Sequence, residues 1–414
     1  MKAGAEGSPL TDYGLVLNAG SSSLKFSIYR RPAAATWGLE AQGQVDGIGS
    51  TPRLSARDAA GTSIAGESLP AAVGDGKAAL EVIGAWVRER YHGSRVLGVG
   101  HRVVHGGPHY SRPCVVTPQV LADLRALVPL APLHQPYNVA AIEAAVERLP
   151  DVPQVACFDT GFHRGQPALA QLVPLPQEIR EAGVQRYGFH GISYEYIASV
   201  LPTVAPEIAE GRVIVAHLGS GASLCAMKAR KSVDSTLGFT ALDGLCMGTR
   251  PGSLDPGVVL HLFQTLGLSA KEVETILYKR SGLLGISGLS NDMRALEASP
   301  DPRARLAVDY FVYQVAKHVG ALAAVLGGVD ALVFTAGIGE HSATIRRRIC
   351  EASAWLGLAL DDAANEAHGP RISAAGSRVA AWVIPTNEEL MIAKHTGPLL
   401  GINDPAPASA LTGA

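Results

Sequence analysis

The chain contains 414 residues, of which 47% are hydrophobic and 17% charged, and its formal net charge is −2. This length and apolar content predict two domains built on buried sheets, and they exclude a disordered or fibrous protein. Because the charge is nearly balanced and no basic stripe is interleaved with aromatic residues, the sequence also argues against a nucleic-acid partner.

The cysteines and the apolar stretches favour a cytoplasmic protein. Five cysteines are scattered singly without a CxxC pair, which is typical of reduced thiols and not of a disulfide framework or a zinc site. Residues 1–13 lack the apolar core of a signal peptide. The longest apolar region, near 315–339, is interrupted by charged residues and by Gly327-Gly328. We interpret it as a helix followed by a buried strand, and we expect no membrane partner.

The N-terminal half begins with β-type segments and continues with helices. We expect strands at 14–29, near 36–46 and at 95–107, a helix at about 77–91, and loops at 49–68 and 108–118. Further along, we expect a helix at 117–128, a non-helical proline-rich stretch at 129–138, a helix from the cap Asn138 to Arg148, and a strand at 154–159. A change of domain is expected near 159–171.

The C-terminal half alternates strands and helices. We expect strands at 212–218, 222–228 and 331–336, and helices near 256–266, 271–279, 303–326 and 343–356, the last capped by Ser342. A Gly-rich turn is expected after residue 336, and a strand at 378–387 leads into a final helix that we expect to return to the first domain. Hairpins followed by crossing helices predict an α/β architecture with mixed sheets.

Three Gly-rich turns follow buried-type strands, at residues 15–29, 213–227 and 330–340. In the first, Asn18, Gly20 and Ser21 to Ser23 lie where the backbone can approach an anion closely, and Lys25 follows directly. One such turn is usually only a hairpin. Three in one chain predict a nucleotide held between two related domains.

Eight sequence blocks carry a resemblance to a known family. They are NAGSSSLKFS (18–27), HRVVHGG (101–107), FDTGFH (158–163), RYGFHGIS (186–193), HLGSGAS (217–223), MGTRPGSLDP (247–256), AGIGE (336–340) and PTNEEL (385–390). In this order and over nearly the whole chain, the blocks closely resemble the acetate kinase family.

The resemblance implies a fold, a reaction and partners. The implied fold is a duplicated ribonuclease H-like (actin-like ATPase) domain pair with mixed sheets and an interdomain nucleotide cleft. Residues 1–160 with about 392–414 would form the acetate and phosphate side, and residues 161–391 the nucleotide-binding domain. The implied reaction is reversible phosphoryl transfer between ATP and acetate, giving acetyl phosphate and ADP with Mg²⁺, or with Mn²⁺ in its place. A homodimer and a metabolic link to phosphate acetyltransferase are also implied.

The phosphoryl acceptor, acetate, determines which groups such a site must supply. A carboxylate with a pKa of about 4–5 is already ionised at neutral pH, so no base is needed to activate it. The difficulty is to bring an anion up to a polyanion and to hold the reacting atoms in line. Arginine forks and uncommitted histidines are therefore the groups to expect.

The resemblance assigns roles to residues of the matched blocks. The catalytic residues are Arg102, His134, Asp159, His190 and Arg250. Arg102 would also bind the acetate carboxylate, and Val104, Leu133, Phe189 and Ala241 would contact its methyl group. Asn18 and Glu388 would hold Mg²⁺, whereas an N-cap role for Asp159 and a helix-dipole role for Glu388 remain the structural alternatives.

The nucleotide is assigned to a larger set of residues in four segments of the chain. They are Lys25, His217, Gly219, Ser220, Gly221, Asp292, Met293, Arg294, Gly337, Ile338, Gly339 and His341. His217 stays outside the catalytic list, as do His101, His105 and His163, because a lone histidine is usually structural.

Four positions depart from the family pattern. Ser220 and His341 stand where asparagine is usual, and Met293 where phenylalanine is common, so the nucleobase preference is open. Ala241 stands where proline is common near the methyl pocket, which could admit propionate. Since one methylene is worth only about 1–3 kcal/mol, acetate use should persist.

Several alternatives stay open beside acetate kinase. One is a propionate-preferring short-chain carboxylate kinase, and butyrate kinase is disfavoured by the HRVVHGG and MGTR blocks. Another is a non-catalytic nucleotide-binding protein of the actin and Hsp70 type, which would not need Arg102, Arg250 and His190 together. An inactive relative is disfavoured because no proposed catalytic position is replaced.

Overall fold

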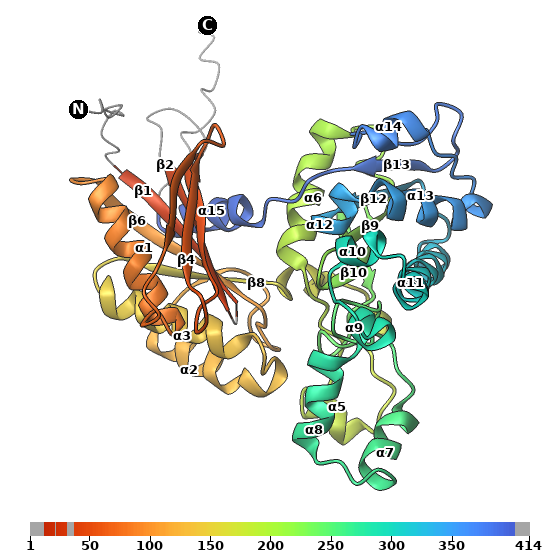
Figure 1. The fold of residues 1–414 in the computed structure, drawn as a ribbon, viewed down its shortest axis with the longest axis horizontal. Helices are drawn as coiled ribbons and strands as arrows, with labels where there is room; N and C mark the ends of the chain where they lie inside the picture. The colour runs from red at the N-terminus through yellow and green to blue at the C-terminus, as the bar shows by residue number, and fades with distance from the viewer. Residues whose placement is uncertain (1–11, 21, 31–36, 402–414) are drawn as a thin grey trace, which may run out of the picture. The chain divides into compact units, whose positions relative to one another are not determined.

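The computed structural model describes residues 12–20, 22–30 and 37–401, and it divides into two compact units (Figure 1). The first unit combines Met1–Gly161 with Asn387–Ala414, and the second is Phe162–Thr386. All of the last helix thus belongs to the first unit. Ser21, part of the first Gly-rich turn, lies outside the described residues. None of the described helices is long and apolar enough to cross a membrane.

The first unit is built on one eight-stranded sheet in the order β5-β4-β3-β2-β1-β6-β8-β7. Its strands are β1 (Asp12–Ala19), β2 (Ser23–Arg30), β3 (Gly38–Asp46), β4 (Arg53–Asp58), β5 (Ser63–Ser68), β6 (Arg95–Val103), β7 (Cys114–Val115) and β8 (Gln154–Phe158). Its helices are α1 (Gly76–Arg90), α2 (Pro118–Ala126), η1 (Val128–Leu130), α3 (Gln135–Arg148) and α15 (Glu388–Leu399), and η2 (Gly161–Gly165) joins the units.

Successive residues of β6 face opposite sides of the sheet, and different helices cover these two sides. Val99 belongs to the core that α1 and α3 share with β1 and β2. Its neighbours Gly98 and Gly100 face the other way, toward α15. A Cβ on Gly100 would lie 2.4 Å from the Thr396 hydroxyl and 2.6 Å from an Ile392 methyl, so glycine allows α15 to lie directly on the strand.

The second unit is built on a five-stranded sheet in the order β11-β10-β9-β12-β13. Its strands are β9 (Arg212–Leu218), β10 (Ala222–Lys228), β11 (Lys231–Ser235), β12 (Ala331–Thr335) and β13 (Ala380–Val383). Its helices are α4 (Ala168–Gln171), α5 (Gln177–Glu181), α6 (Gly191–Val204), α7 (Pro256–Gln264), α8 (Ala270–Thr275), the π-helix η3 (Ile276–Arg280), α9 (Gly282–Ser287), α10 (Met293–Ala298), α11 (Pro302–Leu326), α12 (Ala336–His341), α13 (Ala343–Ala352), η4 (Ala354–Leu356) and α14 (Asp362–Glu366).

The two sheets share one topology. In each, three consecutive strands pair antiparallel, and two later strands continue the sheet in parallel from the first, as β3-β2-β1-β6-β8 and β11-β10-β9-β12-β13. The first hairpin turns also correspond, because Gly20 N–H donates to the Ser23 carbonyl and Gly219 N–H to the Gly221 carbonyl. The predicted α/β class with duplicated, mixed-sheet domains is therefore confirmed.

Most predicted segments agree with the structure, and three do not. The stretch 49–68, expected as loop, forms the hairpin β4–β5, whose inward residues Leu54 and Ala56 are buried. Because the two short strands carry many polar residues on their outer face, the alternation of apolar and polar residues is hard to recognise in the sequence. The Gly-rich segment after Thr335, expected as a turn, is the helix α12. The sequence also provided no prediction of the short strand β7, of strand β11, or of helices α4, α5, α6, α9, α10 and α14.

The third error concerns Asn138, which was expected to cap a helix. Helix α3 instead begins at Gln135 with Pro136 in its first turn, where a missing N–H costs nothing. Asn138 lies inside the helix and is 1% exposed. Its Oδ1 accepts from Val104 N–H at 3.0 Å, and its Nδ2 donates to the Ala19 carbonyl at 2.9 Å. The side chain thus joins α3 to the ends of β1 and β6.

Candidate active site

Arg102 and Asp159 form a bidentate ion pair at one edge of the first sheet. Arg102 is the penultimate residue of β6, and Asp159 directly follows β8. Because these parallel strands are neighbours, with Arg102 opposite Cys157, their carboxyl ends meet at the same edge. Arg102 Nε lies 3.1 Å from both Asp159 oxygens, and its Nη2 lies 2.7 Å from Oδ2. Two of the predicted catalytic residues are therefore in direct contact.

Asn18 and Glu388, the predicted magnesium ligands, lie against the same guanidinium. Asn18 Oδ1 is 3.4 Å from Arg102 Nη1, at the end of a strand that runs parallel to β6. Glu388 begins α15, and its Oε2 is 3.9 Å from Arg102 Nε. Amide and carboxylate oxygens are donors that suit Mg²⁺, which usually takes few of its ligands from protein. In the described part of the chain, no three His, Cys, Asp or Glu side chains are grouped so as to hold a metal.

Burial and neighbouring charges shift the pKa values of the groups in this cluster. Asp159 is 1% exposed, and burial raises the pKa of its carboxyl while the Arg102 charge opposes that rise. Burial alone would lower the pKa of Arg102, but the charges of Asp159 and Glu388 outweigh it and raise that pKa above its usual value. Since both Asp159 oxygens accept hydrogen bonds from the guanidinium, the pair consists of a carboxylate and a guanidinium.

Gln135 anchors the loop that carries Leu133 and His134. Its Oε1 accepts from His105 N–H at 3.1 Å, and its Nε2 donates to the His105 carbonyl at 3.1 Å. Leu133 and His134, half-buried and immediately before α3, are thereby placed beside the segment that follows β6. Val104 lies in that same segment and is 7% exposed, so it offers little surface to a ligand.

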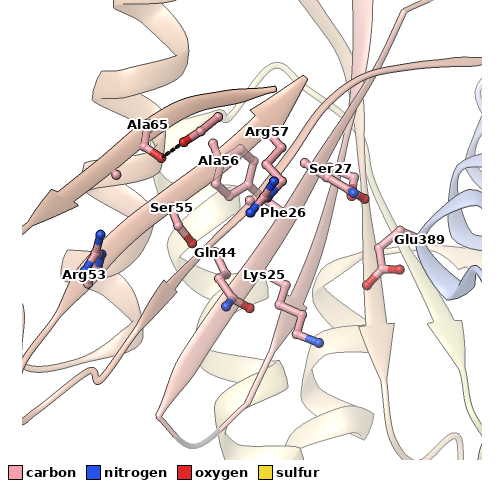
Figure 2. Close-up of a pocket in the computed structure, with 14 residues that line it drawn as sticks. Lys25, Phe26, Ser27, Gln44, Arg53, Ser55, Ala56, Arg57, Ala65 and Glu389 are labelled. Atoms are coloured by element: carbon pink, nitrogen blue, oxygen red, sulfur yellow. Dashed lines mark hydrogen bonds between the residues drawn. The ribbon is translucent and has the colours of Figure 1, made fainter. Parts of the chain in front are cut away.

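Lys25 lies next to Asn18 and at one end of a groove. The two residues are cross-strand partners in β1 and β2, so their side chains share a face of the sheet. Figure 2 shows Lys25 lining a groove of about 460 Å³ together with Gln44, Arg57 and Glu389. Arg102 and Asp159 do not line it, so Lys25 joins the groove to the cluster around Arg102.

In the second unit, Arg250 and His190 converge on the turn between β9 and β10. A Cβ on Gly221 would lie 2.5 Å from Arg250 Nη2 and 3.4 Å from His190 Nε2, so glycine alone leaves room for both side chains. His190 precedes α6 in the left-handed conformation, with a φ of 57°. The two residues predicted to contact the phosphoryl group thus meet at the predicted phosphate turn.

Arg250 differs from Arg102 in its charge balance. Its Nη1 donates to the Ala241 carbonyl at 2.6 Å, and no ion pair links it to a described Asp or Glu. Burial lowers the pKa of Arg250 to about 10. At neutral pH the side chain is still cationic, so a partly buried positive charge faces the turn, and no carboxylate of the described residues forms an ion pair with it. Such a charge is suited to an anionic ligand.

His217 and Phe189 flank His190. The imidazoles of His190 and His217 stack, with ring centroids 4.2 Å apart and planes inclined by 20°. His217 Nδ1 lies 2.8 Å from Ser193 Oγ. Phe189 is 2% exposed, and its carbonyl lies 2.9 Å from His163 Nε2, so it supports the backbone before His190. Its ring offers little free surface for the predicted contact with acetate.

Apart from Lys25, which lies in the first unit, the predicted nucleotide residues come from three segments that the structure brings together. A Cβ on Gly219 would lie 3.8 Å from the Ala336 Cβ, at the start of α12. A Cβ on Gly248 would lie 3.3 Å from Ser220 Oγ and 3.1 Å from the Asn291 carbonyl. The turn at Ser220 therefore adjoins both the segment of Gly337, Ile338, Gly339 and His341 and the loop that precedes α10.

The predicted nucleotide residues at the start of α10 differ in their contacts and in their exposure to solvent. Asp292 caps α10 by accepting from Arg294 N–H, and the two side chains form an ion pair at 2.8 Å. Met293 is 3% exposed, so its side chain belongs to the interior. Arg294 and His341 are exposed. Of this set, Met293 is the least able to contact a ligand directly.

Known proteins of one family are similar to this chain over nearly its whole length. Residues 13–394 match the family model described as the Acetokinase family. The chain belongs to the acetokinase family. A protein from Nitrobacter hamburgensis named acetate kinase is 55% identical over 387 residues, covering 93% of this chain and 96% of the relative. One from Rhodopseudomonas palustris with the same name is 52% identical over 390 residues, covering 93% and 98%.

Solved structures of the acetokinase type show the same fold. Acetate kinase from Porphyromonas gingivalis has a TM-score of 0.82 at 36% identity, covering 94% of this chain and 100% of that one. A propionate kinase from Francisella tularensis has a TM-score of 0.87 at 36% identity, with the same coverage. The two-domain fold expected from the resemblance is therefore confirmed.

Several residues that build this acetokinase-family site were missed from the sequence. Gln135 and Asn138 fix the segment after β6, Ser223 contacts His190, and Tyr194 contacts Ser223. Ser223 carried a usable signal, because it is a polar residue in the otherwise buried strand β10. Asn138 offered none, since asparagine before an apolar helical run is the usual sign of an N-cap.

Proposed function

We propose that this chain catalyses the reversible transfer of the γ-phosphoryl group of ATP to acetate, giving acetyl phosphate and ADP. The observation that carries the proposal is the match to the acetokinase family over residues 13–394, with relatives named acetate kinase at 52–55% identity. The geometry of each unit supports it: Arg102 lies near the end of a central strand of the first unit, and Arg250 of the second unit reaches the turn between β9 and β10.

The reaction proceeds by direct attack of the carboxylate on phosphorus. The acid is already ionised, so the residues position groups and neutralise charge, and none has to remove a proton. Arg102, oriented by Asp159, binds the acetate carboxylate. Arg250 neutralises negative charge on the transferring phosphoryl group, His190 donates a hydrogen bond to its oxygens, and His134 assists.

A magnesium ion completes the proposed chemistry. When bound, it would supply positive charge that offsets part of the negative charge of the nucleotide phosphates. Asn18 and Glu388 would hold it, because each carries an oxygen close to Arg102 and their donor types fit a hard cation. Mn²⁺ has the same ligand preference and is the expected substitute.

The proposed partners extend beyond the substrates. We propose a homodimer formed through the second unit, supported by exposed apolar side chains on α7, among them Leu260 and Phe263 at 54% and 39% exposure. A metabolic link to phosphate acetyltransferase follows if acetyl phosphate is the product. Five free cysteines fit a reducing, cytoplasmic location.

The deciding experiment is ATP turnover with acetate, propionate and butyrate side by side at saturating Mg²⁺. Acetate should give the highest kcat/KM, with propionate reduced by about 10-fold or more because its extra methylene must fit beside Ala241. A higher kcat/KM for propionate than for acetate would show that propionate is the preferred substrate. Nucleotide binding without turnover of any acid would instead indicate a non-catalytic relative.

A further inference from the structure

His190 is connected to the interior of the second unit through Ser223. Its Nδ1 lies 2.7 Å from Ser223 Oγ, and Ser223 lies in β10, two residues after Gly221. The other ring nitrogen, Nε2, faces the turn at Gly221, where Arg250 Nη2 also points. One nitrogen of the imidazole is therefore engaged by a buried hydroxyl, and the other is directed to the predicted phosphate turn.

Tyr194 continues this connection. Its hydroxyl lies 2.5 Å from Ser223 Oγ, and both side chains are 0% exposed. Tyr194 follows His190 by one turn of α6, and its N–H donates to the His190 carbonyl at 3.1 Å. Burial raises the pKa of Tyr194 well above its usual value, so the hydroxyl keeps its proton. The three side chains form one hydrogen-bonded chain between α6 and β10.

The direction of the hydrogen bonds follows from counting protons. A buried phenol needs an acceptor for its O–H, and Ser223 Oγ is 2.5 Å away. Ser223 then has its own O–H to place, and His190 Nδ1, at 2.7 Å, can accept it. A neutral imidazole whose Nδ1 accepts carries its proton on Nε2.

We propose that Tyr194 and Ser223 are positioning residues that hold His190 as the neutral tautomer with its proton on Nε2. In this tautomer the ring presents a hydrogen-bond donor to the turn at Gly221. The opposite tautomer would present a lone pair there and repel a phosphoryl oxygen. The stacked ring of His217, at 4.2 Å, fixes the plane of the donor. The expected effect on kcat rests on the proposed function, whereas the tautomer itself does not depend on it.

The direct test is ¹⁵N NMR of the full-length protein with labelled histidine, with the His190 signals assigned from a His190→Gln variant. Near neutral pH, Nδ1 should have the chemical shift of an unprotonated nitrogen and Nε2 that of a protonated one. The reverse pattern in the wild-type protein would overturn the proposal whether or not the chain is an acetate kinase.

Variants test the positioning role separately. Tyr194→Phe and Ser223→Ala should each produce a mixture of tautomers and lower kcat about 10-fold, with KM for ATP changed less than twofold. Ser223→Thr, which restores the hydroxyl, should recover the wild-type tautomer. Tyr196→Phe in the same helix is the matched control and should change neither property. If Tyr194→Phe and Ser223→Ala keep both the wild-type tautomer and kcat, the positioning role is refuted.

Discussion

Asp159 binds Arg102 through both carboxylate oxygens, at the ends of two adjacent parallel strands of the first unit. Arg250 in the second unit is bound instead by a backbone carbonyl, and burial lowers its pKa to about 10. One arginine is thus held by an opposite charge and the other is not. This difference predicts unequal effects of mutation on stability, although both residues are proposed to act in catalysis.

Asp159→Asn should impair both stability and activity. The substitution leaves Arg102 with a neutral partner in a partly buried site, which should cost about 2–4 kcal/mol of unfolding free energy. Because Arg102 loses its orientation, kcat/KM for acetate should fall about 100-fold or more. Urea unfolding and initial rates measure the two effects. Glu143→Gln, in the exposed pair with Arg125, is the control and should cost less than about 1 kcal/mol. Wild-type rates in Asp159→Asn would contradict the role assigned to the pair.

Arg250→Ala should remove activity without destabilising the fold. The Ala241 carbonyl loses its donor, but no charge loses its partner and the cost of burying a guanidinium disappears, so the unfolding free energy should change little. kcat should fall about 100- to 1,000-fold because charge on the phosphoryl group is no longer neutralised, while the Kd for nucleotide changes little. Arg230→Ala, in an exposed pair with Glu210, is the control. An unchanged kcat would remove Arg250 from the mechanism.

Glu388→Gln should raise the Mg²⁺ requirement. The amide keeps the size of the side chain but removes the charge near Arg102, so the Mg²⁺ concentration for half-maximal rate should rise about 10-fold. Glu389→Gln is a close control, because Glu389 is the next residue of α15 and lines the groove shown in Figure 2. Superimposable Mg²⁺ titrations for Glu388→Gln and wild type would rule out Glu388 as a metal anchor.

The sequence predicted elements whose pattern is local and missed those that depend on tertiary partners. Strands β9 and β10 were placed at their observed bounds, because long apolar runs flank a Gly turn. The hairpin β4–β5 was missed because only Leu54 and Ala56 mark its buried face. In α12, two glycines in six residues indicated a turn, yet the segment is helical, with Glu340 Oε1 accepting from Ala336 N–H at 2.8 Å.

The residues of the candidate site show the same contrast between local sequence pattern and tertiary contact. Conspicuous charged residues in unusual blocks, such as Arg102 and Arg250, were found from the sequence. The positioning roles of Gln135 and Asn138 were not, because a contact such as that between Asn138 and Val104 spans 34 residues and leaves no periodic trace. The residues that orient a site are therefore harder to predict than those proposed to touch the substrate.

Asn138→Ala should destabilise the first unit by about 2–3 kcal/mol. The substitution leaves the Val104 N–H and the Ala19 carbonyl without the partners they have now, and the better helix propensity of alanine offsets only part of that loss. Glu147→Ala, at an exposed position of the same helix, should cost less than about 1 kcal/mol. Thermal or urea unfolding gives the difference, and equal values for the two variants would show that Asn138 is not a structural link.

Stability should fall as the pH drops from about 6.5 to 4, because His101 is buried without charge. Burial lowers its pKa to about 4, although the hydrogen bond that His101 Nε2 donates to Gln154 Oε1 opposes this shift, whereas the unfolded chain titrates near 6.5. Between these values the unfolded state binds a proton that the folded state does not, so the full stability is present above 6.5 and decreases toward 4. The loss should total about 3 kcal/mol for this group.

His163 adds to the same acid sensitivity, since burial lowers its pKa to about 4 as well. His101→Gln should therefore flatten only part of the dependence of unfolding free energy on pH, measured by urea titrations at half-unit steps from pH 4 to 7. His92→Gln, at an exposed histidine, should leave the slope unchanged. A slope in His101→Gln identical to that of the wild type would show that His101 does not contribute, because the linkage requires its folded and unfolded pKa values to differ.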